Sequence, residues 1–325
     1  FSTLYVDLLS ENTLNYHIDF GRNNAHSIDA LLGYTVESTR NQRVAMTATG
    51  FATDDVHTLN AATVYSLASK GNGNTDGTGT FRYPDVVLES YLGRINYSYL
   101  GRYLLSTSLR LDRSSLFSKG NRNAWFPSVS LGWRVNEEKF MKNIEVISNL
   151  KLRASYGRAG QAVTGVSRYP YQGTFTEGGG YNFGTSQSYT EGVYESTAGN
   201  KNIKWEISDM ANFGVDFDLW NKKIYGSVDL FKEWRSNILV SRSTVPSLFG
   251  VNAPQDSYGK AETKGFEVTL GHSNRIGDFE YYIDGMLTFN TNKITEMDEL
   301  TPDYAYQART GNRIDQSQLL IWKQW

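Results

Sequence analysis

The feature that most constrains this chain is a two-residue alternation of apolar and polar side chains that recurs along much of its length. Residues 212–219 read NFGVDFDL, so the apolar side chains all fall on one parity. Successive side chains of a strand point to opposite faces, so this pattern predicts a strand with one apolar and one polar face. Only Asn221 to Lys223 separates it from a second such stretch, which predicts a hairpin with a tight turn.

Similar segments predict about ten strands in an all-β, antiparallel, up-and-down meander. Their expected ranges are 14–20, 27–37, 88–99, 103–112, 127–135, 150–157, 212–219, 224–230, 264–275 and 279–290. The connections alternate between short turns and long loops, and the long ones are 38–87, 158–207 and 235–263. Bacterial outer-membrane barrels have this asymmetry between their two ends. The connection 136–149 lies at the short-turn end and is expected to hold a short helix around Glu137 to Lys142.

The positions of the charged residues indicate which face meets lipid. Charges keep almost entirely to the polar parity, and the exceptions Glu89, Lys232 and His272 are expected near strand ends. A misplaced Lys or Arg at the bilayer midplane costs roughly 2–4 kcal/mol, so the alternation predicts a transmembrane β-barrel with a polar lumen. Ser130 and Asp216 should face the lumen, and Leu131 and Phe217 the lipid. The expected lumen-lining residues are Arg94, Arg110, Arg134, Asp216 and Asp229, and the expected interface aromatics are Tyr34, Trp133 and Trp234.

Composition excludes several other classes. No apolar run approaches the roughly 20 residues of a membrane-spanning helix. The 32 basic and 34 acidic residues are interspersed, so no nucleic-acid partner is expected, and the absence of cysteine excludes disulfides and thiolate metal sites. The first residues carry no signal-peptide pattern, and the chain begins and ends in mid-pattern. We therefore expect residues 1–325 to be part of a larger barrel.

Three linked motifs carry a resemblance to a known family. They are YLGRINYSYLGRYLLSTSLRLDRSSLF at 91–117, FPSVSLGWRVNEEKFMK at 126–142 and ISNLKLRASYGRAG at 147–160, and KGFEVTLG follows at 264–271. In order and spacing, the chain resembles the SusC/RagA class of TonB-dependent receptors over residues 14–313. Arg113 stands where the family's loop usually carries Gly, and the tail after Ile314 departs from the usual pattern.

The resemblance implies a barrel of about 22 strands around a plug, in the bacterial outer membrane. The signal, the plug, the TonB-contacting segment and the final strands are not expected within this sequence. The implied function is active import of a large hydrophilic nutrient, a glycan fragment or an oligopeptide, driven by the TonB complex and assisted by a SusD-like surface lipoprotein. A passive porin and a surface adhesin remain alternatives, and a barrel hydrolase built on Asp54 and His57 is a weaker one.

The residues offer few candidate sites, and no cofactor, metal site or catalytic group is expected. The four histidines have no partner at metal-ligand spacing. Aromatic rings in the long loops are suited to stacking on sugars or contacting a partner protein, although packing among loops explains them as well. These candidate substrate contacts are Tyr169, Tyr171, Tyr181, Tyr189 and Trp205, with Tyr194 beside them.

Overall fold

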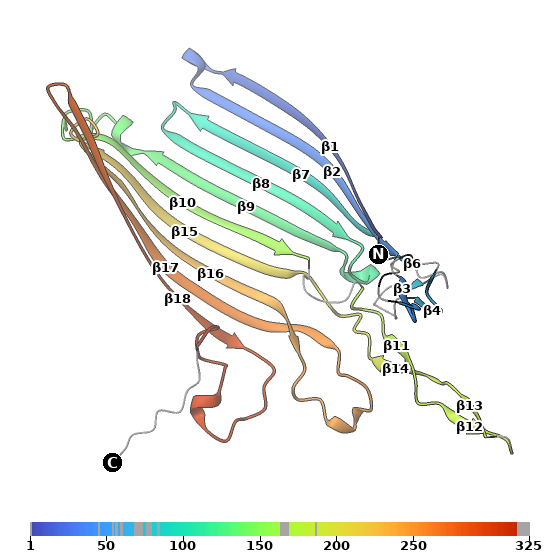
Figure 1. Cartoon of the computed structure of the whole chain (residues 1–325). Helices are drawn as coiled ribbons and strands as arrows, with labels where there is room; N and C mark the ends of the chain where they lie inside the picture. The colour runs from blue at the N-terminus through green and yellow to red at the C-terminus, as the bar shows by residue number, and fades with distance from the viewer. Residues whose placement is uncertain are drawn as a thin grey trace.

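The computed structural model is dominated by ten long antiparallel strands that form one curved sheet (Figure 1). It describes residues 2–316 apart from 45, 54, 56, 57, 59, 60, 68–73, 76–79, 83, 84, 163–168 and 186. The long strands are β1 (Ser2–Phe20), β2 (His26–Val44), β7 (Val86–Tyr99), β8 (Tyr103–Ser114), β9 (Asn123–Arg134), β10 (Ile147–Gln161), β15 (Glu206–Leu219), β16 (Ile224–Ser241), β17 (Gln255–Ile276) and β18 (Phe279–Glu296). Each expected strand is therefore present.

Each long strand pairs with its neighbour along the chain, in the order β1, β2, β7, β8, β9, β10, β15, β16, β17, β18. Shorter elements lie in the long connections. They are β3 (Met46–Thr49), β4 (Val64–Leu67), β5 (Asn74–Thr75), β6 (Thr80–Arg82), β11 (Thr174–Glu177), β12 (Tyr181–Phe183), β13 (Ser188–Thr190) and β14 (Val193–Thr197). The 3-10 turns are η1 (Arg22–Asn24), η3 (Lys119–Asn121), η4 (Val135–Glu137), η5 (Ser247–Phe249) and η6 (Ala305–Gln307). No helix among the described residues is long and apolar enough to cross a membrane.

The two ends of the sheet differ as the sequence predicts. The short turns lie together at one end, at the upper left of Figure 1, and the long loops lie at the other. The expected helix around Glu137 to Lys142 is wrong, because only the turn Val135–Glu137 is helical. Glu138 has extended backbone (φ −75°, ψ 147°), and its carboxylate accepts hydrogen bonds from the Tyr103 hydroxyl at 2.7 Å and the Trp133 indole at 3.2 Å. These side-chain bonds hold the segment in a chain of turns rather than a helix.

The register aligns side chains of one kind across the whole sheet. One row of directly paired residues is apolar on all ten long strands: Ile18, Ile28, Tyr97, Leu105, Leu131, Ala154, Phe213, Leu230, Phe266 and Phe289. The adjacent row, on the opposite face, is polar on seven consecutive strands: His17, Asp29, Asn96, Ser106, Ser130, Ser155 and Asn212. A one-residue slip of any strand would exchange its faces, so the register is strongly specified.

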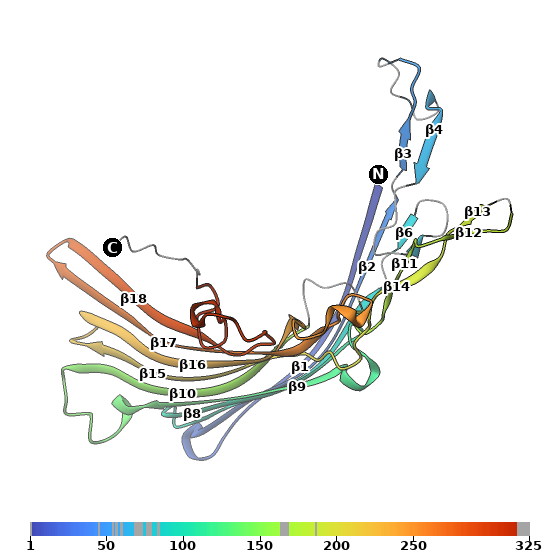
Figure 2. The ribbon, with the colours of Figure 1, turned by 90° about the horizontal axis from the view of Figure 1, so that it is seen from below.

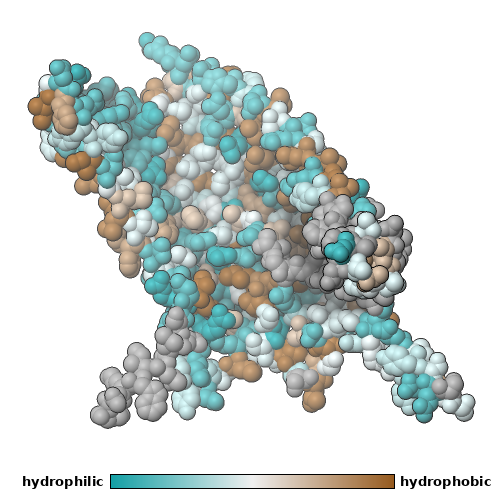
Figure 3. Space-filling model, in the orientation of Figure 1, coloured by the Kyte–Doolittle hydropathy of each residue, from teal (hydrophilic) through white to brown (hydrophobic). Residues whose placement is uncertain are grey.

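The sheet curves like a trough (Figure 2). Its hollow is covered mainly by hydrophilic and neutral residues, with hydrophobic residues along the margins (Figure 3). Large apolar side chains are exposed on the opposite, convex face, where Leu131 is 55% exposed and Leu230 is 53% exposed. Apolar patches of this extent require an apolar environment, which a bilayer supplies.

The apolar face ends at a consistent height. On β7, β8 and β15, its first charged residue lies ten positions from the last residue at the short-turn end: Glu89 from Tyr99, Arg113 from Tyr103 and Asp209 from Leu219. Ten residues at ~3.3 Å each, tilted by ~35–45°, give a band ~25 Å tall, which is the apolar height of a bacterial barrel. The strands continue beyond it on the loop side.

Candidate functional site

An ion-pair cluster joins three neighbouring strands on the polar face of the sheet. Arg153 on β10 donates two hydrogen bonds to Asp216 on β15, both 2.8 Å, and one to Asp229 on β16 at 3.0 Å. Gly214 lies between them, and a Cβ there would stand 2.8 Å from the Arg153 guanidinium and 2.6 Å from the Asp229 carboxylate. The glycine therefore allows one guanidinium to bridge carboxylates from two strands. All three side chains are partly exposed, which leaves the cluster open to water and to a polar ligand.

The five predicted lumen-lining residues all lie on this polar face. Asp216 and Asp229 belong to the cluster, whereas Arg94, Arg110 and Arg134 are spread along other strands. Arg110 pairs with Asp112 at 2.6 Å and donates to the Ser90 hydroxyl at 3.0 Å. Arg134 lies directly opposite Lys151, whose other neighbour is Asp216. The face therefore carries charges of both signs, and its role as the lining of an aqueous channel stays a prediction.

A small buried core lies where the long loops meet the sheet. Phe117 and Ile203 are almost fully buried, and Trp205 stacks on Phe117 with ring centroids 5.1 Å apart. The edge of Phe126 meets the same indole at 5.8 Å, and the indole nitrogen donates to the Arg122 carbonyl oxygen at 3.0 Å. With 5% of its surface exposed, Trp205 has no free face for a sugar ring. Its burial removes it from the candidate substrate contacts and gives it a packing role.

The loop tyrosines fall into two groups rather than one site. Tyr169 and Tyr171 lie near the sheet, with rings 5.8 Å apart, and the Tyr169 hydroxyl donates to the Asp85 carbonyl oxygen at 2.6 Å. Tyr181, Tyr189 and Tyr194 lie on a projecting arm formed by β11 with β14 and β12 with β13 (Figure 1). Tyr181 is 72% exposed. The arm is thus an exposed aromatic surface remote from the polar cluster.

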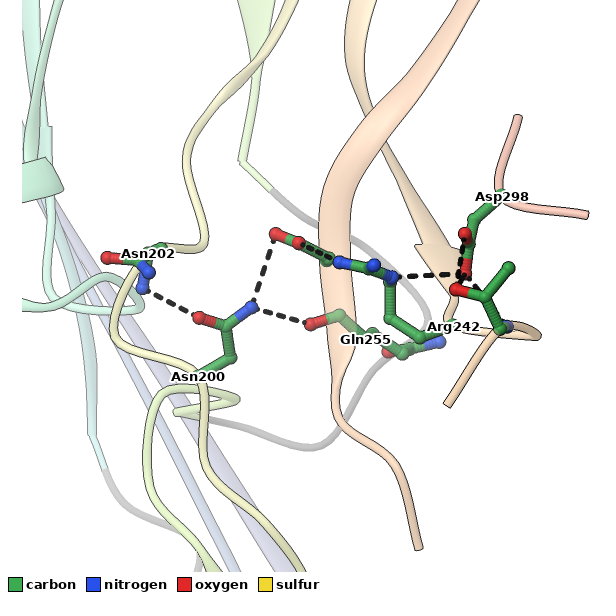
Figure 4. A network of polar contacts seen from close by, with 7 residues as sticks. Asn200, Asn202, Arg242, Gln255 and Asp298 are labelled. Carbon is green, nitrogen blue, oxygen red and sulfur yellow. Dashed lines mark hydrogen bonds and ion pairs between the residues drawn. The ribbon is translucent and has the colours of Figure 1, made fainter. Parts of the chain in front are cut away.

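A third feature, which sequence reasoning missed, ties three loops together (Figure 4). Arg242 bridges Asp298 and Asp256, at 3.0 Å to each, and Asn200 donates to Asp256 at 3.2 Å and to the Gln255 carbonyl oxygen at 2.9 Å. We call this group the loop clamp: Asn200, Arg242, Thr244, Gln255, Asp256 and Asp298. Its contacts from Arg242 to Asp298 and from Asn200 to Asp256 each join residues more than fifty positions apart, so no local sequence signal could have identified it.

The electrostatics of the clamp favour its ion pairs. Burial by itself would raise the pKa of Asp298, but hydrogen bonds from the Thr244 hydroxyl and amide, together with Arg242, outweigh burial and hold that pKa below its ordinary value. The hydrogen bonds that Arg242 donates, first to Asp298 and then to Asp256, raise the pKa of Arg242. Both groups therefore stay charged at neutral pH, and the clamp holds the loop bases in a fixed arrangement.

The described residues contain no group of three or more side chains suited to holding a metal ion. Of the hydrolase pair, Asp54 and His57 both lie outside the described residues.

Comparisons with known proteins agree with this geometry. The family described as TonB dependent receptor-like, beta-barrel matches residues 3–320. A TonB-dependent receptor of Formosa agariphila is 30% identical over 292 residues, which cover 89% of this chain and 28% of that protein. The TonB-dependent receptor SusC of Bacteroides thetaiotaomicron is 35% identical over 231 residues, which cover 70% of this chain and 22% of that protein. The chain thus spans less than a third of the length of these relatives.

Solved structures show the same fold. The structure of the RagAB peptide transporter matches with a TM-score of 0.71 and 24% identity, over 91% of this chain and 31% of that one. The RagAB peptide importer in its open-open state matches with a TM-score of 0.74 and 22% identity, over 93% of this chain and 32% of that one. Fold, register and family match agree, and the chain belongs to the TonB-dependent receptor β-barrel family of the bacterial outer membrane.

Proposed function

We propose that the intact receptor imports a large hydrophilic nutrient, a glycan fragment or an oligopeptide, across the outer membrane with energy delivered through TonB. The observation that carries this proposal is the polar face, whose side chains on seven consecutive strands are polar in one row. Such a face suits a hydrated substrate in a wide bore rather than a hydrophobic one. Family membership supports the coupling to TonB.

The chain would supply part of the barrel wall. Among the described residues β1 and β18 do not pair with each other, so the sheet is open. Backbone groups in lipid must be paired, which for strands requires closure. We infer that further strands complete a barrel of about 22 strands around a plug, as the family resemblance implies.

The same proposal includes a SusD-like surface lipoprotein that caps the loop end. The projecting arm supports this part, because Phe175, Tyr181 and Tyr189 are each more than 60% exposed, and exposed aromatic surface is typical of protein contacts. The loop clamp would hold the neighbouring loops still, which lowers the entropic cost of docking.

An uptake assay tests import directly. Cells carrying the full gene should take up a labelled oligosaccharide or peptide mixture, and should lose that uptake when TonB is deleted or the proton gradient is collapsed. Replacing Asp216 and Asp229 with Asn should reduce uptake without reducing the amount of folded receptor. Glu137→Gln with Glu145→Gln, which removes two exposed carboxylates at the short-turn end, is the matched control. Uptake unaffected by loss of TonB would favour a passive porin.

A pull-down tests the partner. Gentle detergent extraction of the full-length receptor should recover a surface lipoprotein in near-equal amount, and replacing the arm 174–197 with a short Gly-Ser linker should weaken recovery. Recovery of no lipoprotein from the unaltered receptor would contradict the capped arrangement and favour an adhesin or a simple porin, while leaving the uptake assay to decide on import.

A further inference from the structure

The loop-side edge of the apolar face is charged, and its charges are distributed unevenly. On β7 to β15 each cation of this edge has a carboxylate: Arg113 lies 3.7 Å from Glu89, and Arg158 lies 2.8 Å from Asp209. On β16 to β18 three lysines share one carboxylate. These lysines, Lys232, Lys264 and Lys293, form what we call the basic patch.

Within the basic patch the register places like charges together. Lys232 and Lys264 are directly opposite each other on β16 and β17, an arrangement that is unfavourable unless an anion compensates it. Glu262 pairs with Lys232 at 3.1 Å, and its cross-strand neighbour on β18 is Lys293. Lys264 and Lys293 are exposed, and neither makes an ion pair with any residue that the structure describes. The patch therefore has an excess of about two positive charges.

The sequence suggested that Lys232 lies near a strand end, and this is wrong. The three lysines lie within strands that continue beyond the apolar band. Lys232 is the ninth residue of the 18-residue strand β16. Its Nζ lies 5.0 Å from the centre of the Trp234 ring, and indole rings favour the membrane interface. Both observations place the patch at the boundary between the apolar band and water, on the loop side.

The surface on the short-turn side of the patch is apolar, and the patch itself borders a polar hollow. The next row toward the short turns carries Phe266 and Phe289, whose ring centroids are 5.7 Å apart, and Phe289 is 57% exposed. A hollow of about 400 Å³ lies at the level of the patch, and Lys264, Lys293 and Arg313 line it together with the single carboxylate Glu262. A ligand that fits both parts has an anionic head and a hydrocarbon tail.

We propose that the basic patch binds the phosphate groups of an anionic lipid in the outer leaflet, with the acyl chains lying along Phe266 and Phe289. The chemistry is a charge-assisted contact between ammonium groups and phosphate oxygens, strengthened near lipid because water is scarce there. The ion pairs on β7 to β15 match each cation with a carboxylate and leave no comparable excess, so the lipid site occupies one sector of the barrel wall.

The test uses the full-length receptor, purified and delipidated in an uncharged detergent. Phosphatidic acid, phosphatidylcholine with the same chains, and inorganic phosphate are titrated separately, and bound lipid is counted by native mass spectrometry. Phosphatidic acid should bind most tightly. The double variant Lys264→Gln with Lys293→Gln should bind it roughly thirtyfold more weakly, because each basic residue near a membrane surface contributes about 1 kcal/mol. Neither lysine forms an ion pair with a described residue, so the variant should fold.

Two controls make the outcome specific. Lys264→Arg with Lys293→Arg should retain binding, and Lys139→Gln with Lys142→Gln, which removes the same charge at the short-turn end, should leave it unchanged. Equal binding of phosphatidic acid by the receptor and the Lys264→Gln, Lys293→Gln variant would overturn the proposal. Inorganic phosphate or phosphatidylcholine that binds as tightly as phosphatidic acid would also overturn it.

Discussion

The two edges of the apolar band are built from different side chains. At the short-turn edge a row of aromatic rings crosses five strands. The rings belong to Phe20, His26, Tyr99, Tyr103 and Trp133, and the centroids of neighbouring rings are 4.9–6.4 Å apart. At the loop edge the same face carries ion pairs and lysines, such as Arg158 with Asp209. The short-turn edge is therefore a continuous row of rings, whereas the loop edge is mainly ionic and carries only separate rings such as Trp125.

The side chains of each edge match the polarity of the membrane region beside it. Aromatic rings with a polar end suit a headgroup region that is partly apolar, and their stacking adds about 0.5–1.5 kcal/mol per pair. Charged side chains suit a region rich in charged groups and water. The strands end soon after the aromatic edge but run on past the ionic edge, so the loop side of the sheet must be stable in water as well as in lipid.

The largest effect is expected from a charge placed inside the band. Val129→Lys on β9 puts an ammonium group on the lipid-facing parity midway between the edges, and should lower the free energy of unfolding by about 2–4 kcal/mol. Ser130→Lys adds the same charge to the opposite face and should change it by less than about 1 kcal/mol. Urea titration of the full-length receptor in vesicles measures both. Equal losses would show that the two faces are not distinguished by lipid.

A smaller effect should follow from removing the aromatic edge. Trp133 stacks on Tyr103 and donates to Glu138, whereas Trp125, on the same strand and face, lies at the loop edge with 56% of its surface exposed. Trp133→Ala should cost about 1–2 kcal/mol and Trp125→Ala about half as much or less. The same titration compares them. A larger loss for Trp125→Ala would reverse the roles that we assign to the two edges.

The ionic edge should respond to salt. Arg158→Met breaks a pair in which the arginine is 41% exposed, so the loss should be only about 0.5 kcal/mol after solvent screening. The difference from the unaltered receptor should shrink as the salt concentration rises. Trp133→Ala, which removes no charge, is the control, and its effect should not depend on salt. A salt-independent loss at Arg158 would argue against an ionic role.

The smallest effect concerns acid and the loop clamp. The pKa of Asp298 is held below its ordinary value in the folded loops, so its stabilising contribution is present above its ordinary pKa and is lost as the pH falls through the lowered one. Hydrogen exchange of residues 242–254 should therefore quicken, relative to that of β8, only in strong acid. Asp298→Asn should show the quicker exchange already at neutral pH. Exchange that quickens near neutrality in the unaltered receptor would contradict this assignment.

The sequence predicted the strands best where lipid constrains them. Alternation is strong only where one face must be apolar, so the prediction for β17 began at residue 264, whereas the strand begins at Gln255. Residues 255–263 lie mostly beyond the band and carry few apolar side chains, which removes the signal. The same reason explains why Lys232 was expected at a strand end.

The site was less predictable because its contacts join distant segments. The polar face followed from parity, but the bridge from Arg153 to both Asp216 and Asp229 depends on the register and on Gly214 between them. Trp205 resembles any exposed loop aromatic in sequence, and only the fold brings it against Phe117 and Phe126. Both phenylalanines lie in the motifs that carried the family resemblance, which was the one available hint.

The most direct test of the band and its ionic edge is a nitroxide scan along β16. Single cysteines from Ile224 to Ser241 in the full-length receptor are labelled in vesicles, and their accessibility to oxygen and to a water-soluble nickel complex is measured. Oxygen accessibility should alternate with a period of two, peak at Val228 and Leu230, and lose its alternation beyond Lys232 as the nickel complex gains access. Alternation of opposite phase, or alternation that continues unchanged to Ser241, would contradict the arrangement of faces and edges described above.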